Sequence, residues 1–185
     1  ANPAVSGTDP FNSSNLVFLG NLPAGGPDDT VTFTGAALDA FLDSRAGQGA
    51  TLLVVSKYNS NRQLLFHSSE ATADTPALVF NAEDLPPTEE ITLGVEADTY
   101  VNAWNTDSSP SDVAYGLSTN GWMTVRSRTT APTYRMQVCY IRFDLSSQQG
   151  LQNANLILTE LEESSAGANP AVVYGLPDVA GLTAQ

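Results

Sequence analysis

Aromatic and arginine side chains gather in the second half of the chain, where they offer the chemistry of a sugar-binding platform. Aromatic faces stack on the C–H groups of pyranose rings, and guanidinium forks hold carboxylates through paired hydrogen bonds. Six of the seven cationic residues are arginine, and four of these lie between residues 122 and 143. The predicted carbohydrate-binding residues are Trp104, Trp122, Arg126, Arg128, Tyr140 and Arg142.

A competing interpretation is that these arginines pair with acidic residues across neighbouring strands, which is a common fate of charged strand residues. The formal net charge of −13 also opposes an anionic polysaccharide, unless calcium bridges the two.

Carboxylates suggest a second kind of site, because oxygen-rich loops at the edge of a sandwich need a cation to relieve repulsion. The chain has one cysteine and one histidine, too few for a Cys/His zinc site or a Cys-His nucleophilic pair, so calcium is the metal that the composition favours. No EF-hand spacing is present, and ordinary solvated acids remain the alternative. The predicted calcium ligands are Glu96, Asp98, Asp107, Asp112 and Asp144.

Catalytic patterns are weak. Two pairs of adjacent carboxylates are present, Glu162–Glu163 and Asp28–Asp29. Nothing in the surrounding sequence sets the distance between two carboxyl groups that a glycosidase requires. The sequence contains no G-x-S-x-G motif, so there is no nucleophilic serine of that kind for His67 to activate as a base. We therefore expect a protein that is not an enzyme.

The amino-acid composition limits the classes of partner that we expect. The chain has 185 residues, with 20 acidic side chains against seven Lys and Arg. Such a chain repels phosphate backbones, so we expect no nucleic-acid partner. No run approaches the ~18 apolar residues of a spanning helix, so we expect no membrane span. The acidic surface fits an extracellular or cell-surface protein that is kept soluble by its charge.

The elements that must position these residues are strands. In residues 138–147, Cys139, Ile141, Phe143 and Leu145 alternate with polar neighbours, which predicts a central strand with one buried face. Its apolar side chains are expected to pack against the strands at 52–55 and 64–66. Residues 16–19 predict a short buried strand, and residues 36–44 have the spacing of a single amphipathic helix.

About ten short strands separated by turn clusters, with one short helix, predict an all-β fold, a jelly-roll β-sandwich. Residues 81–90 are acidic and carry a Pro-Pro pair, so they predict a linker between residues 1–80 and residues 91–185.

Several motifs carry a family resemblance. In the second part they are residues 97–101, 115–118, 123–127, 140–147 and 172–178; in the first part they are the Asn-Pro-Ala opening, the Thr-rich strand before the helix, and residues 66–71 and 76–80. In this order the chain resembles the DNRLRE-type domain, the alginate-related carbohydrate-binding module family, with its two halves reversed. Residues 91–185 look like the N-terminal half of that module, and residues 1–80 look like its C-terminal half.

The reversed order leaves two physical solutions. The halves either close on each other within one chain, as in a circular permutant, or each half completes a neighbouring copy or repeat. The second solution predicts a non-catalytic, extracellular structural module of a surface filament or matrix, whose partners are copies of itself joined head-to-tail or neighbouring repeats. The alternative that the resemblance implies is a carbohydrate-binding module for an acidic polysaccharide, assisted by calcium.

Overall fold

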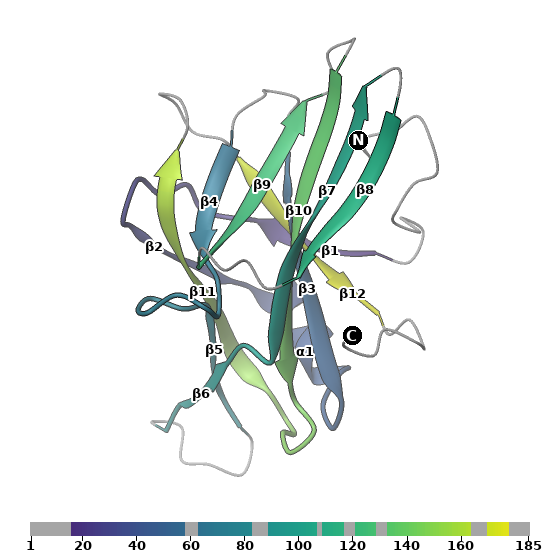
Figure 1. Ribbon diagram of the computed structural model, residues 1–185. Coiled ribbons are helices and arrows are strands. Elements are labelled where there is room, and N and C mark those ends of the chain that lie inside the picture. Colours follow the sequence, from purple (N-terminus) through teal and green to yellow (C-terminus); the bar gives the residue numbers. More distant parts are fainter. Residues whose placement is uncertain are drawn as a thin grey trace.

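The computed structural model describes residues 16–57, 63–82, 89–106, 109–116, 121–128, 133–163 and 170–177. These residues form twelve β-strands and one α-helix (Figure 1). The elements are β1 (Val17–Asn21), β2 (Thr30–Thr34), α1 (Ala36–Asp43), β3 (Gly49–Ser56), β4 (Gln63–His67), β5 (Ala77–Asn81), β6 (Ile91–Gly94), β7 (Ala97–Thr106), β8 (Ser109–Gly116), β9 (Trp122–Arg128), β10 (Thr133–Asp144), β11 (Gln152–Glu163) and β12 (Ala171–Leu176). The predicted all-β class with one short helix is confirmed.

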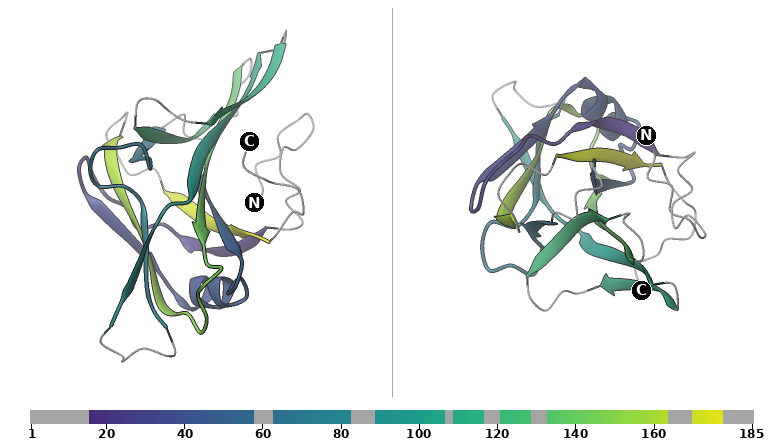
Figure 2. Two further views of the ribbon diagram at one scale, coloured as in Figure 1. Left: turned by 60° about the horizontal axis from the view of Figure 1, so that its bottom comes forward. Right: turned by 90° about the horizontal axis from the view of Figure 1, so that it is seen from above.

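The strands form two antiparallel layers of an open sandwich (Figure 2). One layer has the order β1-β12-β3-β10-β7-β8, and the other has the order β2-β11-β5-β6. The pair β4–β9 joins them, because β9 pairs with the start of β10 and β4 pairs with the end of β11. The two twelve-residue strands β10 and β11 therefore connect the layers, and they exceed the short strands expected from the sequence.

Residues 138–147 were predicted as a central strand, and they form the end of β10 and the turn after it. Cys139, Ile141, Phe143 and Leu145 are all fully buried, as predicted. β10 pairs with β3 from Cys139 opposite Val54 to Asp144 opposite Gly49. The core that these side chains enter also contains Leu64 and Phe66 of β4, which confirms the expected packing.

The sequence predicted that this strand has one buried face, but side chains on the other face of β3 and β10 are also buried. Leu53 and Val138 point away from the main core, yet they are buried in a second apolar cluster with Val55, Met136 and Val172. The continuous apolar run of β3 fits this burial on both faces, because alternation disappears when neither side of a strand faces water.

Helix α1 begins after Gly35 and buries Leu38, Phe41 and Leu42. These residues recur at the three- and four-residue spacing of one helical face, which is why the periodic pattern in the sequence found this helix. The helix contacts β1 in one layer and β11 in the other, so it closes one end of the sandwich (Figure 2).

The two parts of the chain interlock within one molecule. β1 pairs with β12, β3 with β10 and β12, and β2 and β5 with β11. Between the parts, β5 and β6 pair antiparallel, and Asn81 Nδ2 donates to the Glu89 carbonyl at 2.8 Å. The strands on either side of the segment predicted as a linker are thus neighbours in one sheet, while residues 83–88 of that segment lie outside the described residues. In the computed structural model the strands of residues 16–81 therefore pair with those of residues 91–176 within one molecule.

No helix in the described ranges has the length and apolar character needed to cross a membrane.

Candidate functional site

Tyr140 and Arg142 lie on the outer face of the first layer, on the opposite side of β10 from Cys139 and Ile141. The ladder places Tyr140 between Leu53 of β3 and Thr99 of β7, and Arg142 between Thr51 and Ala97. Directly opposite residues of neighbouring strands point to the same face. These two predicted sugar-binding residues are therefore neighbours on one surface, and both are partly exposed.

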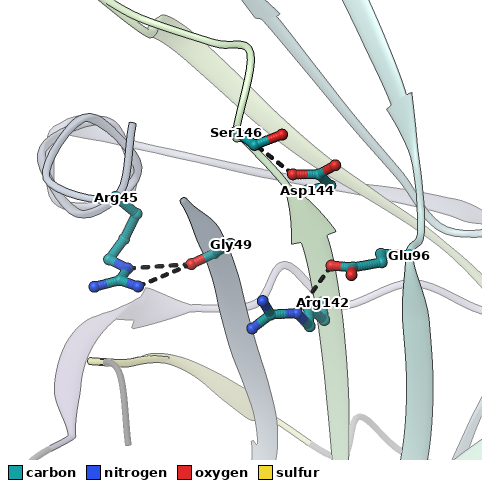
Figure 3. A network of polar contacts seen from close by, with 6 residues as sticks. All are labelled: Arg45, Gly49, Glu96, Arg142, Asp144 and Ser146. Atoms are coloured by element: carbon teal, nitrogen blue, oxygen red, sulfur yellow. Dashed lines mark hydrogen bonds and ion pairs between the residues drawn. The ribbon is translucent and has the colours of Figure 1, made fainter. Parts of the chain in front are cut away.

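Glu96 holds Arg142 through a side-chain contact, which Figure 3 shows, and through a backbone hydrogen bond. Arg142 Nε donates to Glu96 Oε2 at 2.8 Å, and the Glu96 backbone N–H donates to the Arg142 carbonyl at 2.8 Å. The side chains are 35% and 46% exposed, so water screens the pair and its contribution to stability is well under about 1 kcal/mol. Its role is to orient the guanidinium rather than to stabilise the fold.

Gly49 makes room for that guanidinium. A Cβ atom at this position would overlap Nη2 and Cζ of Arg142, so the arginine lies across the glycine backbone. The same glycine carbonyl accepts hydrogen bonds from Arg45 Nε at 3.2 Å and Nη2 at 3.1 Å (Figure 3). The start of β3 thus lies between two arginines, Arg45 and Arg142.

Trp122 and Arg126 lie elsewhere. Arg126 is opposite Gln137 in the β9–β10 ladder, and Gln137 shares the face of Cys139. Trp122 is on the same side of β9 as Arg126, and its ring stacks on Tyr100 with centroids 6.0 Å apart. The predicted platform is therefore divided between opposite faces of the ladder. Trp104 and Arg128 belong to β7 and β9, but their side chains are outside the described residues.

Three of the predicted calcium ligands have described side chains, and each of these has another partner. Glu96 binds Arg142, Asp98 accepts hydrogen bonds from Ser69, and Asp144 accepts one from the Ser146 backbone N–H at 2.9 Å. Asp107 lies outside the described residues, as does the side chain of Asp112. Across the described ranges, no three His, Cys, Asp or Glu residues gather in an arrangement that could hold a metal ion.

Asp98 is partly buried and accepts two hydrogen bonds from one residue, Ser69. Ser69 donates its backbone N–H to Oδ2 at 2.7 Å and its hydroxyl to Oδ1 at 3.2 Å. Burial raises the pKa of Asp98 above its ordinary value, the nearby Glu70 carboxylate adds to the rise, and the two Ser69 hydrogen bonds partly oppose it. This carboxyl group therefore holds its proton more tightly in the folded protein than a solvated aspartate does.

Asp144 behaves in the opposite way. The hydrogen bonds from Ser146 and the nearby positive charge of Arg142 lower its pKa. Cys139, by contrast, has its pKa raised well above the ordinary value by complete burial, which keeps the thiol protonated. Cys139 is thus a core residue, as predicted.

Sequence reasoning missed the surface character of β1. The apolar run at 16–19 predicted a buried strand, but Val17 is 42% and Phe18 is 54% exposed. The physical reason is that β1 lies at the edge of its layer, with β12 as its only partner among the described strands. The one relevant signal in the sequence was Gly20, directly after the apolar run, because a glycine within a strand often marks an irregularity in pairing. In the structure the β1–β12 register shifts between Phe18 and Gly20.

No protein-family model, no curated protein and no solved structure matches the chain. The resemblance to the DNRLRE-type domain therefore stays a prediction.

Proposed function

We propose that the protein is a non-catalytic structural module that associates with copies of itself in an extracellular filament or matrix. The observation that carries the proposal is an apolar group of strands on a strongly acidic molecule, with Lys57 at its rim, where its Nζ donates to Asn21 Oδ1 at 3.0 Å. Strands β1, β12 and β3 are neighbours and contain no Asp, Glu, Lys or Arg, although the chain has a net charge of −13. In this group of strands Val17 and Phe18 are exposed.

Exposed apolar area is costly in water, at about 25 cal/mol for each Å². Contiguous apolar surface rimmed by polar residues commonly marks a site of association. Acidic surfaces elsewhere keep copies apart, so strands without acidic side chains are where two copies can approach with the least repulsion.

The pairing of strands within one chain limits which strands a neighbouring copy can pair with. Since the strands of residues 16–81 already pair with those of residues 91–176, a neighbouring copy would complete an open sheet edge rather than a missing half.

Light scattering coupled to size exclusion, over a wide range of protein concentrations, tests this function together with negative-stain imaging. We expect the mass to increase with concentration. Compact monomers at every concentration would refute the proposal.

A second candidate function is binding of an acidic polysaccharide. Tyr140 and Arg142 favour it, because an aromatic ring and an oriented guanidinium lie side by side on one face. The resemblance to the DNRLRE-type domain supports the same candidate, and calcium would offset the negative charge of both partners.

A glycan panel with and without added calcium separates the two functions. Arg142→Ala should abolish binding if the outer face is the sugar site, whereas Arg126→Ala, on the other side of the ladder, is the matched control. Equal loss from both variants, or no binding to any glycan, would count against this candidate.

A further inference from the structure

We draw no further inference here: the strongest candidate, the surface patch that Phe18 of β1 and Tyr174 of β12 form at the edge of the first layer, carries none because nothing in the structure shows what covers it, since the residues directly before β1 lie outside the described ranges.

Discussion

Asp98 and Asp144 show how two carboxyl groups of one acidic protein acquire opposite effects on stability. Both have an ordinary pKa of 3.8. Burial raises the pKa of Asp98 in the folded protein, so the folded state binds its proton more tightly than the unfolded state does. Hydrogen bonds from Ser146 lower the pKa of Asp144, so there the unfolded state binds the proton more tightly.

The sign of the pH dependence follows from proton linkage. Asp98 subtracts from stability as pH rises through the window above 3.8. Asp144 adds stability above 3.8, and this contribution is lost as pH falls through its lower folded pKa. We predict that the melting temperature of Asp98→Asn, relative to wild type, increases as pH rises from about 3 to about 7.

Asp144→Asn provides the control for this prediction, since its melting temperature relative to wild type should decrease over the same range. Thermal unfolding followed by circular dichroism measures both. Parallel pH curves for Asp98→Asn and wild type would show that the carboxyl group is not perturbed by the fold.

At the scale of elements, helix α1 depends on a glycine in a distant strand. Phe41 of α1 lies over Gly175 of β12, and a Cβ atom at residue 175 would overlap the aromatic ring. Phe41 is 5% exposed, so the ring has little room to move. The close approach of helix to sheet therefore requires the missing side chain.

We predict that Gly175→Ala destabilises the protein by about 1–3 kcal/mol, the usual cost of overpacking a core. Gly94→Ala is the matched control, because Gly94 is also a strand glycine and a Cβ atom there meets nothing within 4 Å. Its free energy of unfolding should stay within about 0.5 kcal/mol of wild type. Urea denaturation measures both changes, and equal values for the two variants would contradict the role assigned to Phe41.

At the scale of the whole molecule, net charge and edge pairing oppose each other. Two copies of charge −13 repel over the Debye length, which is about 30 Å at 0.01 M salt and about 8 Å at 0.15 M. A contact through the apolar strands that the proposed function requires is short in range, so salt screens the repulsion but leaves the contact itself nearly unchanged.

We therefore predict that self-association strengthens as salt increases from about 0.01 M to about 0.15 M. Sedimentation velocity at fixed protein concentration measures the associated fraction. Association that weakens with salt would mean that opposite charges hold the copies together, and the apolar strands would then not be the contact surface.

Alternation was the most informative signal in the sequence. It placed Cys139, Ile141 and Phe143 in the core and Tyr140 and Arg142 on the other face, because successive strand residues point to opposite sides. Helical spacing located α1 for a similar reason.

The candidate site was less predictable, because residues in one sequence region can belong to different faces. Arg126 and Arg142 are 16 positions apart in the chain, yet the β9–β10 register puts them on opposite sides of the ladder. Asp98 accepts a hydrogen bond from Ser69, which lies in a turn after β4. The two residues are 29 positions apart, so no local sequence pattern predicts this contact.

The sequence by itself determined the all-β class, the position of helix α1, the inward face of β10 and the acidic character of the chain, because these depend on local periodicity and composition. The tertiary structure decided that residues 16–81 and 91–176 interlock within one chain, that the apolar run of β1 ends at a sheet edge, and that Gly175 lies beneath Phe41. Burial and pairing depend on which strands become neighbours, and the pairing of strands far apart in the chain is settled only when the layers close on a common core.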